Sequence, residues 1–142
     1  MIAVRKILKK RGIDDWGDGA FGAPRGNHTH RGIDYESEVD DEVFSPVKGS
    51  VTKLGYPYTP KPGDKITFRY VEITDYKGNR HRVFYIDPSV GIEQHVDITT
   101  VIGLAQDISG KYESPHKKPM INHVHYEIFD ANGELINPGE FV

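Results

Sequence analysis

Glycine and proline constrain this chain more than any other feature, because they recur along its whole length. The 142 residues include 15 Gly and 9 Pro, which divide the sequence into short segments without a low-complexity tract or an internal repeat. Both residues interrupt regular structure, and short segments suit strands better than long helices. The sequence therefore predicts an all-β, mainly antiparallel single domain, sandwich-like and with long loops.

Several segments carry the β-branched and aromatic residues that are typical of strands. Residues 66–75 (ITFRYVEITD) and 80–86 (RHRVFYI) flank the turn sequence YKGN and predict a β-hairpin. Residues 123–130 (HVHYEIFD) predict another strand. Residues 42–56 predict a further strand region, which a proline and a glycine interrupt as at a bend or bulge.

The N-terminus differs from the rest of the chain, because only residues 5–11 have a weakly helical pattern. We expect this segment to pack on the sheet or to serve as a docking tail. We accordingly divide the chain into an N-terminal extension, residues 1–16, and a domain, residues 17–142. Long loops, where functional sites are usually built, are expected at residues 17–30, 56–64 and 106–122.

Composition excludes several classes of protein. The chain has 18 Lys and Arg against 21 Asp and Glu, so it lacks the basic excess of a nucleic-acid binder. It has no cysteine, so any metal must be held by His, Asp or Glu. The longest apolar run near the N-terminus, Met1 to Val4, is too short for a signal peptide or a membrane span. We therefore expect synthesis in the cytoplasm and no membrane span.

Two pairs of residues have the spacing of a metal site. His30 and Asp34 are four residues apart beside a glycine-rich loop (GNHTHRGIDY). His123 and His125 project to one face of their predicted strand, about 7 Å apart, because side chains alternate in a strand. Imidazole and carboxylate are the ligands of catalytic zinc, which keeps one position open for water. A His-x-His pair alone is a weak signal, but the joint pattern predicts three or four metal ligands.

The remaining histidines give weaker indications. His28 is either a spare ligand or a solvated loop residue. His81 is expected to lie away from the site, and His95 and His116 lie in polar sequence typical of a solvated surface.

At these residues the sequence resembles the lysostaphin/LytM-type zinc endopeptidases, which cleave peptide cross-links in bacterial peptidoglycan. HRGIDY matches the family's His-x-Gly-x-Asp segment and HVHYEI its His-Leu-His-Phe-Glu motif, while VFSPVKGSVTKLG and VIG match two supporting elements. The resemblance covers residues 17–138. It implies the duplicated hybrid-motif fold of that family, one zinc ion, and peptidoglycan stem peptides as substrate.

The resemblance also implies roles for individual residues. His30, Asp34 and His125 would be the zinc ligands, and His123 the catalytic base. Zinc lowers the pKa of its bound water to about 7, and a neutral imidazole beside it can take a proton and pass it to the leaving amine. A ligand and a base at alternate positions of one strand would keep this geometry fixed.

One position departs from the family pattern. Relatives carry a Tyr-x-His-Leu segment whose histidine lines the site and stabilises the tetrahedral intermediate, but here the segment reads FYIDPSV. Asp87, which replaces that histidine as a substrate-binding residue, cannot donate a hydrogen bond unless it is protonated. We expect Tyr85, on the same strand face, to donate to the oxyanion instead.

Two other resemblances bear on activity and setting. FYIDPSV followed by NHVHYEI is similar to the vertebrate leukocyte-cell-derived chemotaxin, which has the same fold and binds zinc but is not regarded as a peptidase. The compact domain is also similar to small phage and prophage proteins, which meet peptidoglycan after holin-mediated release or as virion components. We expect a monomer unless the chain is part of such a particle.

Three functions therefore remain open. The first is a zinc endopeptidase acting on peptidoglycan, and the second is a zinc-stabilised domain that binds peptide or glycan without cutting it. The third is a cupin with His28 and His30 as ligands, but the second cupin motif is absent from the sequence and the His123/His125 pair would have no role.

Overall fold

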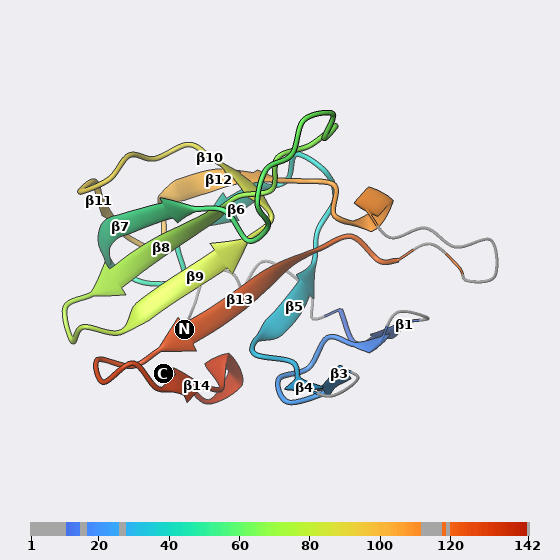
Figure 1. Cartoon of the computed structure of the whole chain (residues 1–142). Helices are drawn as coiled ribbons and strands as arrows, with labels where there is room; N and C mark the ends of the chain where they lie inside the picture. The colour runs from blue at the N-terminus through green and yellow to red at the C-terminus, as the bar shows by residue number, and fades with distance from the viewer. Residues whose placement is uncertain (1–10, 15–16, 26–27, 112–117, 119, 142) are drawn as a thin grey trace.

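The computed structural model describes residues 11–14, 17–25, 28–111, 118 and 120–141. In this part of the chain the regular structure is almost entirely antiparallel β-strand (Figure 1), which confirms the predicted fold class. Of the segment predicted to be helical, only Arg11 lies within the described residues. None of the helices in these ranges is long and apolar enough to cross a membrane.

A seven-stranded sheet forms the body of the molecule. Its strand order is β11-β7-β8-β9-β13-β14, and β5 also pairs with β13. The strands are β5 (Ile33–Glu36), β7 (Gly49–Gly55), β8 (Tyr70–Asp75), β9 (Arg80–Phe84), β11 (His95–Val96), β13 (His123–Phe129) and β14 (Leu135–Ile136).

Smaller elements complete the fold. A three-stranded sheet has the order β10-β12-β6, formed by β10 (Ile86–Pro88), β12 (Val101–Ala105) and β6 (Glu42–Phe44). Two short ribbons pair β1 (Ile13–Asp14) with β2 (Gly17–Asp18), and β3 (Pro24–Arg25) with β4 (His28–Thr29). The 3-10 helices are η1 (Ser109–Lys111) and η2 (Pro138–Glu140).

The predicted strands are confirmed, with changes at their ends. The hairpin β8–β9 forms as predicted, but β8 begins at Tyr70 and β9 ends at Phe84. The reason for the second end is Tyr85, whose φ of 70° is left-handed and breaks the strand. The chain then continues as β10 in the smaller sheet. The region from 42 to 56 is interrupted as predicted, between β6 and β7.

The core lies between the two sheets. Alternate residues of β8, β9 and β13 point to one side of the large sheet, where Ile73, Val83 and Val124 pack in one cluster with Ile86 and Ile102 of the smaller sheet. All five side chains are 0% exposed, and burying each contributes about 1.5–3 kcal/mol. Because one face of the large sheet is used for the core, its other face is available for polar and functional side chains.

Candidate metal centre

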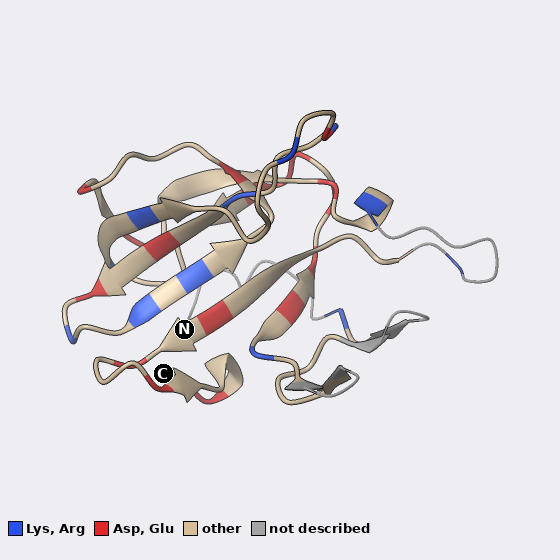
Figure 2. Ribbon diagram, in the orientation of Figure 1, with Lys and Arg blue, Asp and Glu red and all other residues tan. Residues whose placement is uncertain are grey.

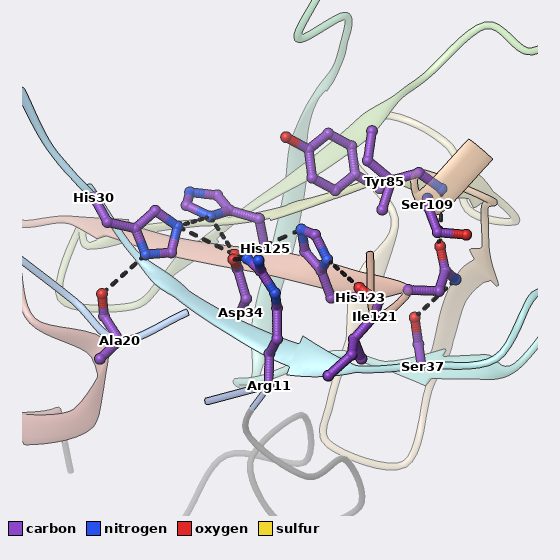
Figure 3. Close-up of polar contacts among 12 residues, drawn as sticks. Arg11, Ala20, His30, Asp34, Ser37, Tyr85, Ser109, Ile121, His123 and His125 are labelled. Carbon is purple, nitrogen blue, oxygen red and sulfur yellow. Dashed lines mark hydrogen bonds and ion pairs between the residues drawn. The ribbon is translucent and has the colours of Figure 1, made fainter. Parts of the chain in front are cut away.

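Two neighbouring strands carry two of the three candidate ligands. In the β5–β13 ladder Asp34 lies directly opposite His125, so both side chains project from the same face of the sheet. His30 lies in the loop just before β5, and its side chain converges on the same point (Figure 3). The structure thus brings together His30, Asp34 and His125, the three residues predicted as ligands, as a group that could hold a metal ion.

The three inward-facing atoms form a compact triangle. His125 Nδ1 lies 2.9 Å from His30 Nε2 and 2.9 Å from Asp34 Oδ1, and His30 Nε2 lies 3.2 Å from Asp34 Oδ1. All three residues are buried, with at most 9% of their surface exposed. A tetrahedral zinc ion with its usual ligand distances spaces its ligand atoms about 3.4 Å apart. The triangle is therefore close to the size that zinc requires.

The outer nitrogens of both histidines face acceptors. His30 Nδ1 donates to the carbonyl of Ala20 at 3.0 Å, and His125 Nε2 donates to the carboxylate of Glu127 at 3.0 Å. Carbonyl and carboxylate oxygens can only accept, so both rings can keep a proton on the outer nitrogen and, around a metal ion, turn the lone pair of the inner nitrogen toward it. Outer partners of this kind fix the orientation of metal-binding histidines. Three converging electron-rich atoms need a cation between them, and the site fits a zinc ion on these grounds.

Gly32 permits the close approach of the loop to β13. A Cβ at this position would collide with the carbonyl oxygen of Tyr126 and would lie 2.9 Å from the ring of His125. A side chain here would displace His125, so the glycine of the His-x-Gly-x-Asp segment has a packing reason in this structure.

Arg11 binds the side of Asp34 that faces away from the triangle. Its Nη1 donates to Asp34 Oδ2 at 2.8 Å, and both side chains are 3% exposed. The backbones are joined too, since Arg11 N–H donates to the carbonyl of Asp34. Residue 11 therefore contacts the centre, although the proposed domain boundary after residue 16 stays a prediction.

The ionisable groups of the centre shift one another's pKa values. Burial alone would raise the pKa of Asp34, but hydrogen bonds from His125 and His30, together with nearby histidine charges, hold that pKa well below its usual range. Burial alone would lower the pKa of His125, but hydrogen bonds to Asp34 and Glu127 raise it to about 9. In the absence of a metal, a proton on His125 therefore supplies the cation that the triangle requires.

His123 lies beside the triangle and outside it. Its Nδ1 donates to the carbonyl of Ile121 at 2.8 Å, so the unprotonated Nε2 faces the centre, 3.6 Å from Asp34 Oδ2 (Figure 3). Burial lowers the pKa of His123 and exceeds the opposing attraction of Asp34, which keeps the imidazole neutral near pH 7. A neutral imidazole with its lone pair toward the centre has the geometry and the charge of a proton acceptor.

Tyr85 contacts His123 from the other side. Their rings meet edge to face, with centroids 5.8 Å apart. Tyr85 O–H lies 3.3 Å from the hydroxyl of Tyr58, and the two tyrosine rings are stacked. The left-handed backbone of Tyr85 is uncommon for a bulky residue, and hydrogen bonds with Arg69 and Gln106 hold it in place.

Asp87 does not share a strand with Tyr85. Because β9 ends at Phe84, Asp87 belongs to β10, where it lies opposite Leu104 and is exposed. The expectation that Tyr85 and Asp87 lie on one strand face was wrong, because alternation does not continue through the left-handed residue.

Two other histidines, His81 and His95, are separate from the centre. His81 is 0% exposed and lies in the core side of the hairpin, between Tyr126 O–H at 2.7 Å and Asp75 Oδ2 at 2.9 Å. His95 is exposed on β11 and contacts Ser50. His116 lies outside the described residues.

Arg11 and Glu127 were not predicted from the sequence as residues of the site. Glu127 could have been found, because it follows His123 and His125 at the same two-residue spacing and must share their face. Nothing in the sequence marks Arg11, which is 23 residues from its partner Asp34.

Comparison with solved structures shows that this fold is similar to that of the lysostaphin catalytic domain. The catalytic domain of the antimicrobial peptidase lysostaphin from Staphylococcus simulans is 14% identical, with a TM-score of 0.59 over 90% of each chain. A zinc-containing peptidase from Vibrio cholerae is 18% identical, with a TM-score of 0.56 over 91% of this chain but only 38% of its own.

The same fold occurs in another setting. A chain of the SpoIIQ-SpoIIIAH pore forming complex is 21% identical, with a TM-score of 0.60 over 95% of this chain and 82% of its own. No protein-family profile and no curated protein sequence matches the chain significantly. The resemblance to the lysostaphin/LytM family is therefore confirmed at the level of the fold.

Proposed function

We propose that this protein is a zinc metalloendopeptidase that hydrolyses peptide cross-links of bacterial peptidoglycan. The observation that carries the proposal is the triangle of His30, Asp34 and His125, with the lone pair of His123 beside it. The fold shared with lysostaphin and with a zinc-containing peptidase supports it.

His30, Asp34 and His125 would hold the metal. When bound, zinc lowers the pKa of its water ligand to about 7 and polarises the scissile carbonyl. Glu127 and the Ala20 carbonyl keep both ligand rings oriented, and Arg11 fixes the Asp34 carboxylate through its outer oxygen. These contacts preorganise the centre before substrate arrives.

His123 would move the proton. Its Nε2 accepts a proton from the attacking water and returns it to the amine that leaves, while Nδ1 stays bound to the carbonyl of Ile121. Tyr85, packed against His123, would donate its phenolic O–H to the oxyanion in place of the histidine that relatives carry. Asp87 would contact the substrate at the edge of the smaller sheet.

We also propose where the protein acts. The chain would act on stem peptides in the cell wall or periplasm, after holin-type release or as part of a phage particle, and as a monomer otherwise.

Incubation with purified sacculi tests the reaction directly. Wild-type protein loaded with zinc should release soluble muropeptides, and a chelator should stop the release until zinc is restored. His123→Ala is the matched control, because it removes the proposed base from the same strand that carries a ligand. Release that continues unchanged in the presence of chelator would contradict a zinc mechanism.

A second candidate is a zinc-stabilised binding domain without hydrolytic activity. Two observations favour it: Asp87 replaces the family histidine, and the fold also occurs in a chain of a pore forming complex. Wild type that binds zinc and sacculi but releases no muropeptides from any sacculus tested would establish this function. In a working enzyme, Asp87→His should leave the rate of release the same or raise it toward the level usual in the family.

A further inference from the structure

The sheet face that carries the metal ligands continues beyond them along β13 and β9. Glu127 and Phe129 follow His125 on this face, because side chains alternate along β13. Their partners in the ladder are Arg82 and Arg80 of β9, which therefore project from the same face. Figure 2 shows these basic positions on β9 between acidic positions on β8 and β13.

Three guanidinium groups surround the ring of Phe129. The Cζ atoms of Arg31, Arg80 and Arg82 lie 5.4, 5.5 and 5.0 Å from its centroid, each within cation–π distance. Arg31 comes from the loop between His30 and β5, so the loop that holds a metal ligand also contributes to this group. We call Arg31, Arg80, Arg82 and Phe129 the arginine cluster.

The arginine cluster has an excess of positive charge. Arg82 Nε donates to Glu72 Oε2 at 2.7 Å, and nearby Glu127 is bound to His125. Within the described ranges, no carboxylate lies at ion-pair distance from Arg31 or Arg80. Like charges held around one ring repel each other, and an anion bound among them would offset this repulsion.

The chemistry of the cluster selects a carboxylate. Guanidinium groups bind carboxylates through paired N–H donors, and Arg31 and Arg80 still have such donors to offer. Phe129 is four residues beyond His125, which is about 13 Å along the strand. An extended peptide of about four residues spans this distance, so one substrate can reach both places.

We propose that the arginine cluster is a subsite for a free carboxylate of the peptide substrate, about four residues from the bond held at the metal centre. This inference rests on the proposed function, because it takes the metal centre as the place of reaction. It adds a requirement that the metal centre alone does not impose: the substrate must be an acidic peptide.

Binding to metal-free protein tests the subsite without hydrolysis. The probes are muropeptides released from sacculi by a muramidase and the same muropeptides after carbodiimide amidation of their carboxylates. Isothermal titration calorimetry in chelator measures both, so that no carboxylate can bind to zinc. For wild type, amidation should weaken binding at least ten-fold, and added salt should weaken binding of the untreated probe.

Substitutions that each remove one positive charge show which arginines bind the carboxylate. Arg31→Gln and Arg80→Gln should each weaken binding of untreated muropeptides about ten-fold and leave binding of the amidated probe unchanged. Arg80→Lys should restore part of the loss, since it keeps the charge but not the paired donors. The matched control is Lys48→Gln, an exposed residue between β6 and β7, which should bind as wild type does. Arg82 is left intact because buried Glu72 depends on it.

The results separate this inference from the proposed hydrolysis. If neither probe binds, if amidation has no effect, or if Arg31→Gln and Arg80→Gln bind untreated muropeptides like wild type, the subsite is refuted. If the charge-selective binding is observed but zinc-loaded protein releases nothing from sacculi, the subsite stands and the peptidase does not.

Discussion

His123 and His125 provide a matched pair of substitutions that tests how the centre divides its roles. Both histidines lie on β13, project from the same face and are buried, with 5% and 9% of their surface exposed. They differ in one respect: Nδ1 of His125 is a corner of the triangle, whereas Nε2 of His123 lies 3.6 Å from Asp34. We expect His125→Ala to lose zinc and His123→Ala to keep it.

The size of the effect follows from linkage. At a zinc concentration 100 times the dissociation constant, binding stabilises the folded wild type by about 2.7 kcal/mol. For a chain of this size that free energy raises Tm by about 5–10 °C. His125→Ala leaves two ligand atoms, and a hundred-fold loss of affinity would reduce the stabilisation to about 0.4 kcal/mol, or about 1 °C. His123→Ala should retain most of the zinc-dependent rise.

Thermal unfolding with and without zinc, followed by metal analysis after dialysis, measures both quantities. Each variant is compared with and without zinc, so the cost of the substitution to the metal-free fold cancels. That cost is of a similar kind in both variants, because both histidines are buried. If His123→Ala loses the zinc-dependent rise as completely as His125→Ala, then His123 is a ligand and the proton-transfer role is wrong. If both variants keep their zinc, the triangle is not the metal site.

Three further predictions concern the groups around the triangle. Tyr85→Phe should lower muropeptide release about a hundred- to a thousand-fold at unchanged zinc content, as expected for a lost oxyanion donor, and an unchanged rate would remove that role. Glu127→Gln should weaken zinc binding about 10- to 100-fold in a chelator competition, because His125 loses the carboxylate that orients it; equal affinity would show that the contact is dispensable. The third concerns pH: because the folded pKa of His125, about 9, lies above its unfolded value of 6.5, its contribution to stability is complete below pH 6.5 and is lost as the pH rises through 9. Denaturant unfolding of metal-free protein should therefore show a fall of a few kcal/mol over this range that is absent in His125→Ala, and a flat profile in wild type would refute the raised pKa.

Much of the local structure could be predicted from the sequence because its causes are local. The β8–β9 hairpin is encoded by β-branched residues on both sides of a turn sequence, and β13 by the pattern of residues 123–130. The two-residue period of a strand also dictates that His123 and His125 share a face. The spacing of His30 and Asp34 in a glycine-containing segment, read together with that pair, predicted a group of three or four ligands, and the family resemblance assigned His30, Asp34 and His125 as the three.

The ends of the strands depended on contacts that are distant in the sequence. Tyr85 was expected to continue the strand in regular alternation, but its backbone is held in a left-handed conformation by Arg69 and Gln106. Gln106 is 21 residues away along the chain, and no local sequence pattern predicts that contact. The break moved Asp87 into the other sheet and away from the face it was expected to share.

The surroundings of the centre were decided by the tertiary structure alone. Asp34 and His125 are 91 residues apart and meet only because β5 pairs with β13 in one particular register. That register also brings Arg31 to Phe129, and the backbone contacts of residue 11 with Asp34 bring the Arg11 guanidinium to the ligand carboxylate. The sequence by itself determined which side chains share a strand face, because alternation is a property of neighbouring residues. Which strands lie side by side, and hence which charges surround the metal centre, is set by the packing of the whole chain.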